Sequence, residues 1–136
     1  MVNSWVLKTL FGFTIIYTVA LTIGSLIKPV EIDTTLSYAD KILHTGAYAG
    51  LTFLWLSVYQ LFSSKKQILW TASYKYFLIM ILIVILGIII EVLQGSITSY
   101  RTADTWDAIA NTAGVLFGSI MFLLFFKKIM KLKSTN

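Results

Sequence analysis

The sequence predicts an all-α fold: a multi-pass membrane protein whose four transmembrane helices pack as an antiparallel bundle. Of its 136 residues, 57% are hydrophobic and 12% are charged, whereas charged residues make up about a quarter of an ordinary soluble domain. The apolar residues form four runs of about 20 residues, the length that crosses a bilayer as a helix. Short polar segments separate the runs, so successive helices should be antiparallel neighbours in one domain, residues 1–136.

The first expected span covers about residues 5–27 and carries one charge, Lys8, near its start. A lysine at this position can extend its side chain to the lipid headgroups. The alternative is a cleaved signal peptide, which has an apolar core of about 7–15 residues followed by a cleavage site with small residues. This run is longer and no such site follows it, so we expect a retained helix that ends before Pro29.

The other three spans are expected at about residues 40–62, 74–95 and 103–126. Asp104 would lie in the first turn of the last span, where the positive end of the helix dipole favours a carboxylate.

Glycines recur at a spacing of four residues in two of the spans. Gly114 and Gly118 lie in the fourth span, and Gly46 and Gly50 lie in the second. This small-xxx-small pattern lets two helix backbones approach closely, so we assign these glycines to packing.

The lysines predict the orientation. Eight of them flank the spans on one side, which the positive-inside rule makes cytoplasmic; they are Lys8, Lys65, Lys66, Lys75, Lys127, Lys128, Lys131 and Lys133. The outer side then holds Lys28, Lys41 and Arg101 against all six carboxylates, and both termini are cytoplasmic. Because the lysines flank apolar runs and form no basic stripe with aromatics, we expect membrane lipids and no nucleic acid as partners.

The six carboxylates, the only histidine and the only arginine all fall on the predicted outer side. Glu31 and Asp33 belong to a polar loop and are interpreted as bystanders. The other four acids lie on helical faces or at helix ends; they are Asp40, Glu91, Asp104 and Asp107. Ionisable groups at membrane helix ends are costly unless they are paired or used, so their clustering predicts a site.

In the second span, Asp40, His44 and Tyr48 are spaced by four residues and share one helix face. A carboxylate one turn from a histidine can hold the imidazole in one tautomer and raise its basicity, as suits a general base or a metal ligand. The alternative is an interfacial histidine that only hydrogen-bonds lipid or a neighbouring helix.

Two further faces complete the expected site. In the third span Glu91 and Gln94 share a face with Gly87, and Glu91 lies about one turn inside the bilayer. Its alternative role is a Glu91–Arg101 pair that only locks two helices together. The fourth span carries a stripe of Asp104, Asp107 and Asn111; before it, the planar fork of Arg101 suits bidentate binding of a carboxylate or a phosphate.

In order, these residues read D-K-x-x-H, E-x-x-Q and R-x-x-D-x-x-D-x-x-x-N, and in this combination the chain resembles the VanZ-like family. The resemblance covers spans two to four, about two thirds of the chain. It implies a four-helix protein of the bacterial cytoplasmic membrane, in a family whose founding member is linked to low-level teicoplanin resistance. It also implies that the whole polar set is a site. We assign catalytic roles to Asp40, His44, Glu91, Asp104 and Asp107, and substrate binding to Lys41, Tyr48, Gln94, Arg101 and Asn111.

The chemistry of that site stays open at the level of the sequence. Carboxylates with one imidazole would suit Mg²⁺, Mn²⁺ or Zn²⁺, but no ligand spacing fixes a choice, so the cofactor is unknown. The site could hydrolyse or transfer a lipid phosphate or acyl headgroup, with His44 as the base and Arg101 stabilising developing charge. It could instead bind an envelope lipid or a glycopeptide-related ligand without catalysis. An ion-coupled transporter is less favoured, because the inner halves of the spans lack ionisable groups, and a purely structural bundle is the remaining alternative.

Overall fold

The computed structural model describes residues 4–27, 38–63, 74–97 and 104–134, and these contain four helices. The helices are α1 (Ser4–Leu26), α2 (Ala39–Phe62), α3 (Tyr74–Ile97) and α4 (Thr105–Ser134). The all-α prediction is therefore confirmed. Three helices lie within about two residues of the expected ranges, whereas α4 continues well beyond the expected end at residue 126.

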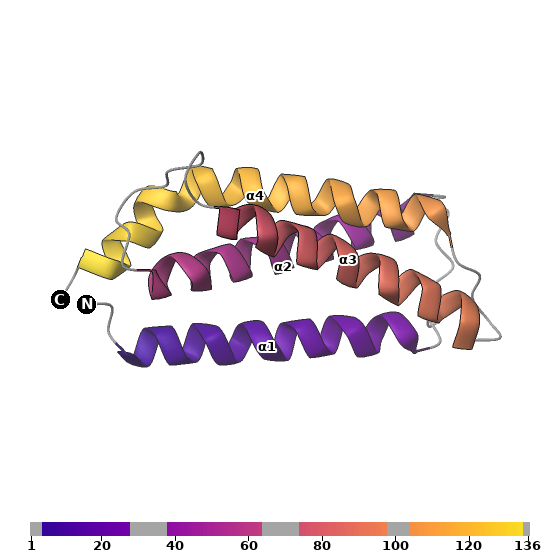
Figure 1. The fold of residues 1–136 in the computed structure, drawn as a ribbon, viewed down its shortest axis with the longest axis horizontal. Coiled ribbons are helices and arrows are strands. Elements are labelled where there is room, and N and C mark those ends of the chain that lie inside the picture. Colours follow the sequence, from indigo (N-terminus) through magenta and orange to yellow (C-terminus); the bar gives the residue numbers. More distant parts are fainter. Residues whose placement is uncertain (1–3, 28–37, 64–73, 98–103, 135–136) are drawn as a thin grey trace.

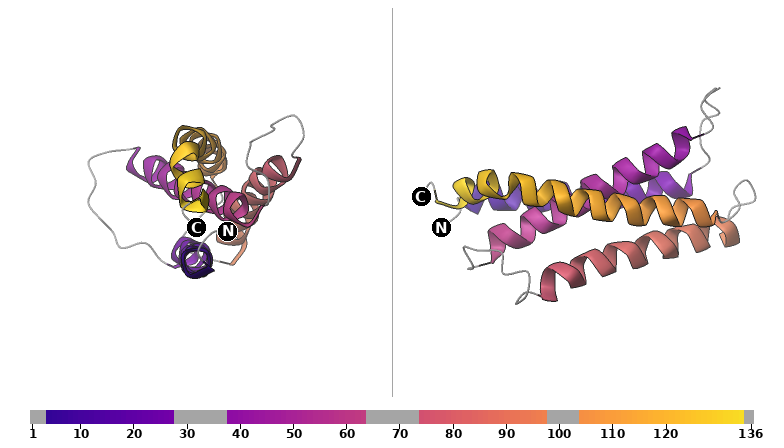
Figure 2. Two further views of the ribbon diagram at one scale, coloured as in Figure 1. Left: turned by 90° about the vertical axis from the view of Figure 1, so that its left-hand side faces the viewer. Right: turned by 90° about the horizontal axis from the view of Figure 1, so that it is seen from above.

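The helices run alternately in opposite directions, so the two ends of the chain lie at the same end of the bundle (Figure 1). Helix α2 lies between α1 on one side and α4 on the other, and it crosses α4 obliquely (Figure 2). Helices α2 and α3 each contact all three other helices, but α2 makes the most extensive contacts, above all with α4, and is the main partner of α1. Helix α2 is thus the centre of the bundle.

Helices α1, α3 and α4 are long and apolar enough to cross a membrane. Their outward faces expose large apolar side chains such as Ile16, Leu82 and Leu124, as expected of surfaces that contact lipid. Helix α2 is as long as α3, but it is more polar and is not among the three helices that length and apolar composition identify as candidate membrane spans. Its polar side chains are directed into the bundle, where Thr52 and Gln60 are fully buried. The chain is a multi-pass membrane protein.

Glycines on α4 allow α2 and α4 to approach closely. A Cβ atom added to Gly118 would lie 2.9 Å from the Cα atom of Ala49, and one added to Gly114 would lie 3.1 Å from the backbone nitrogen of Ala49. Gly50 faces the Tyr17 ring of α1, but a Cβ at Gly46 would meet nothing within 4 Å. The packing role expected of these glycines therefore holds for three of them and is wrong for Gly46.

We predict that Gly118→Ala lowers the thermal unfolding midpoint of the purified protein, because the added methyl group would push α4 away from the Ala49 backbone. Overpacking of this kind costs about 1–3 kcal/mol. The control is Gly46→Ala, which meets open space and gains up to about 1 kcal/mol of helix propensity, so its midpoint should stay equal or rise. Equal midpoints for the two variants would contradict the close contact.

Candidate functional site

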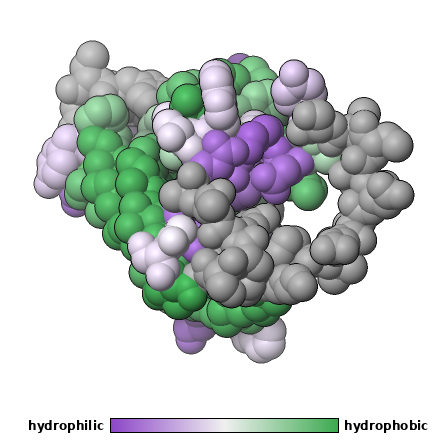
Figure 3. Space-filling model, turned by 90° about the vertical axis from the view of Figure 1, so that its right-hand side faces the viewer, coloured by the Kyte–Doolittle hydropathy of each residue, from purple (hydrophilic) through white to green (hydrophobic). Residues whose placement is uncertain are grey.

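The polar residues gather at the end of the bundle opposite the termini. The start of α2, the end of α3 and the start of α4 meet there, and a hydrophilic patch stands out between apolar helix surfaces (Figure 3). At the other end lie the starts of α1 and α3 and the end of α4, with the described lysines Lys8, Lys75, Lys127, Lys128 and Lys131. The two ends of the bundle thus carry opposite charge among the described residues.

Lys41 is the ammonium group at the centre of three carboxylates. Its Nζ atom lies 2.5 Å from an oxygen of Asp104, forms a short contact with Oδ1 of Asp107, and lies 3.8 Å from Asp40. Sequence reasoning assigned Lys41 to substrate binding and missed this pairing, because Lys41 and Asp107 are 66 residues apart in the chain. In the structure Lys41 acts first as the counter-ion that joins α2 to α4.

Asp104 precedes α4 and caps it, rather than lying in its first turn as expected. One carboxylate oxygen accepts a hydrogen bond of 2.9 Å from the backbone N–H of Trp106, and the other accepts one from Lys41. Such a cap satisfies one of the N–H groups that a helix start leaves without a partner. The hydrogen bond from Lys41, helped by the one from Trp106, lowers the pKa of the Asp104 carboxyl below its ordinary value.

A chain of hydrogen bonds orients His44. The side-chain amide of Asn111 donates to Oε1 of Glu91 at 3.4 Å, so its oxygen is directed at His44, where it lies 2.9 Å from Nδ1. Nδ1 therefore carries the hydrogen and donates it to Asn111. In a neutral imidazole the other nitrogen, Nε2, then presents a lone pair. Glu91 and Asn111 are both buried, so three helices hold the ring in one orientation.

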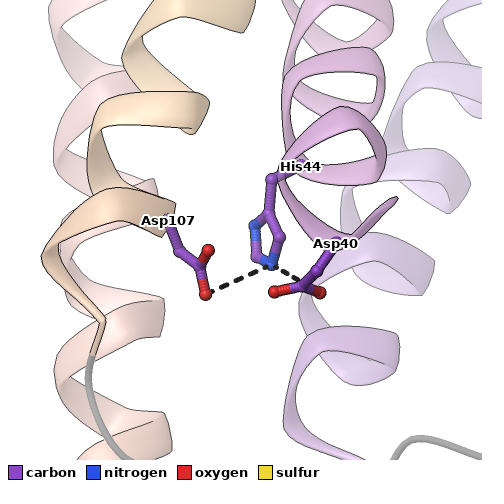
Figure 4. A group of neighbouring side chains, drawn as sticks. All are labelled: Asp40, His44 and Asp107. Carbon is purple, nitrogen blue, oxygen red and sulfur yellow. Dashed lines mark ion pairs between the residues drawn. The ribbon is translucent and has the colours of Figure 1, made fainter. Parts of the chain in front are cut away.

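The Nε2 atom of His44 faces two carboxylates (Figure 4). It lies 3.7 Å from Oδ1 of Asp40, one turn before it on α2, and 3.8 Å from Oδ2 of Asp107 on α4. One ligand atom from each of the three residues lies within 4.8 Å of the others. The group formed by Asp40, His44 and Asp107 is called the His44 triad below.

An open cavity of about 270 Å³ lies between α1 and α2 beside the triad. Asp40 and His44 line it, and so does Tyr48, whose hydroxyl is buried and has no hydrogen-bond partner among the described residues. The remaining walls are mostly apolar and consist of Ala20, Leu21, Gly24, Ser25, Leu43 and Ala47. Sequence reasoning missed the contribution of α1, because an apolar span without a polar face gives no sign of which residues line a cavity.

Among the expected substrate-binding residues, Gln94 joins two helices and Arg101 cannot be placed. Gln94 is buried and donates a hydrogen bond of 2.6 Å to the backbone oxygen of Ser25, so it ties α3 to the cavity wall formed by α1. Arg101 lies outside the described residues, as do Glu31 and Asp33, and the expected Glu91–Arg101 pair stays a prediction. The other expected site residues are brought together around Lys41 and His44.

The fold and this polar end define the class: a multi-pass membrane protein whose helices enclose charged side chains at one end. The chain belongs to the VanZ/LLP1 family, which it matches over residues 3–126. The match includes α1, which the motifs in spans two to four did not cover, and it confirms the family indicated by those motifs. No curated protein and no solved structure matches the chain.

We predict that Asp104→Ala lowers the unfolding midpoint more than Asp104→Asn does. Both variants lose the ion pair with Lys41, but asparagine caps a helix about as well as aspartate and alanine does not. Because the pKa of Asp104 is lowered on folding, its stabilising effect is present above the ordinary pKa and is lost as the pH falls through the lowered value. Thermal unfolding at neutral and acidic pH measures both effects, and equal midpoints for Asp104→Ala and the unsubstituted protein would refute them.

Proposed function

We propose that this protein binds the polar headgroup of an envelope lipid or of a lipid-linked, glycopeptide-related ligand at the outer face of a bacterial cytoplasmic membrane. Through this binding it contributes to resistance against antibiotics of the teicoplanin type. The carrying observation is the cavity between α1 and α2, which has apolar walls and two members of the His44 triad in its lining. An amphiphile suits such a cavity, because its acyl chain can lie along the walls while its headgroup meets the polar residues.

The charge of the described residues indicates what kind of headgroup fits. Four carboxylates lie at this end against the single ammonium group of Lys41. Carboxylates accept hydrogen bonds and attract cations, so hydroxyl and amine groups are favoured ligands. Sugar hydroxyls and amino groups are therefore better suited to this end than a bare phosphate, which the acids would repel.

The orientation in the proposal rests on the lysines. Those described at the end that holds the termini would face the cytoplasm under the positive-inside rule, which puts the cavity at the outer face. Glycopeptide antibiotics act outside the membrane, so a site on this side is in the compartment where it would be needed.

Catalysis is the second candidate, and the orientation of His44 favours it. Its Nδ1–H is held by Asn111, so a neutral ring has Nε2 ready to accept a proton from a ligand in the cavity. This is the arrangement of a general base held in one tautomer by a neighbour. The reaction would be hydrolysis or transfer at a lipid phosphate or acyl headgroup, with Arg101 stabilising the developing charge.

For the binding function we predict that His44→Gln and Asp40→Asn weaken lipid binding at least about tenfold, or about 1.4 kcal/mol. Native mass spectrometry of the protein in detergent would count the bound lipid-linked precursor, and teicoplanin susceptibility would be measured at matched expression. The control is Ser57→Ala on the same helix; its hydroxyl only donates to the Phe53 carbonyl, far from the cavity. If both site variants kept the binding and the susceptibility of the unsubstituted protein, the binding function would be rejected and a purely structural role for the bundle would remain.

Labelled lipid-linked precursors separate catalysis from binding. An enzyme should release product, with turnover lost in His44→Ala and Asp104→Ala. A binder should release none, while Glu91→Gln and Arg101→Lys change its affinity. If the precursor stayed intact after long incubation with the unsubstituted protein, the enzymatic function would be rejected and the binding function would remain.

A further inference from the structure

We propose that the His44 triad is a binding site for one divalent transition-metal ion, Zn²⁺ or Mn²⁺. The ligand atoms would be Nε2 of His44, Oδ1 of Asp40 and Oδ2 of Asp107. This inference extends the proposed function, which does not itself require a metal. It rests on the geometry of the triad, on the electron pairs that face each other there, and on the buried hydroxyl of Tyr48 beside it.

The spacing of the ligand atoms is close to that of a metal site. Bonds of about 2.0–2.2 Å hold the ligand atoms of a tetrahedral ion about 3.3–3.6 Å apart. Nε2 lies 3.7 Å from the Asp40 oxygen and 3.8 Å from the Asp107 oxygen, a few tenths of an ångström beyond that separation. All three ligand atoms lie within 4.8 Å of one another, so binding would also draw the two carboxylates together. Asp40 has room to do so, because its side chain is 48% exposed in the first turn of α2.

The tautomer of His44 directs a lone pair, rather than a hydrogen, at the two carboxylates. Because Nδ1–H donates to Asn111, a neutral ring presents three electron-rich atoms to one another at Nε2 and the two Asp oxygens. These three atoms repel one another, and a cation bound between them would attract all three. Metal-bound histidines usually donate their second N–H to a fixed acceptor, and here Asn111, itself held by Glu91, is that acceptor.

The cavity side of the triad offers an open coordination position. Three protein ligands with a fourth position for water or another ligand are typical of zinc sites that bind substrates. Tyr48 lines the same cavity one turn beyond His44, and its hydroxyl is buried without a partner among the described residues. The Tyr48 ring packs against Gly87 of α3, so this hydroxyl lies beneath the cavity and adds an unused polar group beside the triad.

Lys41 competes with the metal without excluding it. Its ammonium group contacts Oδ1 of Asp107 and leaves Oδ2 directed at His44. A second positive charge beside the ion weakens its binding, so replacing Lys41 by an uncharged residue should raise the affinity. With one imidazole and two carboxylates, the triad suits Zn²⁺ and Mn²⁺ better than Mg²⁺, which favours ligand sets made of oxygen atoms only.

Calorimetric titration tests the proposal on the full chain, purified in detergent without a histidine tag and treated with a chelator. We expect one Zn²⁺ or Mn²⁺ per chain, and a dissociation constant raised at least about tenfold by His44→Gln, Asp40→Asn or Asp107→Asn. Lys41→Met should lower the constant. Ser57→Ala is the control: its hydroxyl donates to the Phe53 carbonyl on the same helix, away from the triad, and its loss should leave the constant unchanged.

The exposed side chain of Asp40 keeps the test decisive, because its substitution by asparagine should leave the helices folded, as circular dichroism would check. No binding at a one-to-one ratio, or equal constants for Asp40→Asn, Ser57→Ala and the unsubstituted protein, would overturn the metal site. Lipid binding measured in excess chelator is a separate readout. It tests the proposed function even where the titration fails.

Discussion

The candidate site depends on one packing contact, the close approach of α2 and α4. Gly114 and Gly118 let α4 lie directly on the backbone of α2 around Ala49. Asn111 precedes Gly114 by one turn and His44 precedes Ala49 by about one turn, so the same contact brings their side chains to 2.9 Å. Side chains larger than hydrogen at the two glycines would separate the helices and with them every contact between α2 and α4 in the site.

The membrane makes this arrangement of polar groups necessary. In hydrocarbon a polar side chain has no water to bond, so the polar face of α2 must find partners within the bundle. Thr45 donates to the Ala110 carbonyl, Thr52 donates to the Tyr48 carbonyl within its own helix, and His44 bonds Asn111. Helix α2, whose polar face needs these partners, accordingly packs on all three other helices.

Much of the fold and part of the site could be predicted from local patterns. Hydrophobic runs located all four helices, and a spacing of four residues identified the shared face of Asp40, His44 and Tyr48. Local patterns do not reveal which distant residues meet. The pairing of Lys41 with Asp107, the Asn111 bond that sets the His44 tautomer, and the α1 wall of the cavity all depend on how the helices pack, as does the different role of Gln94.

The opposite end of the bundle shows why buried polarity alone does not make a site. There the Tyr76 hydroxyl donates to the Gln60 side-chain oxygen, and the Gln60 amide contacts the sulfur of Met130. These groups are neutral, satisfy one another and are packed among Leu56, Leu61 and Phe122. At the His44 end the groups are ionisable, more acids than bases are described, and an open cavity reaches them. A polar cluster used only for packing should resemble the Gln60 end, and this contrast is the reason that the proposed binding is placed at the end that holds His44.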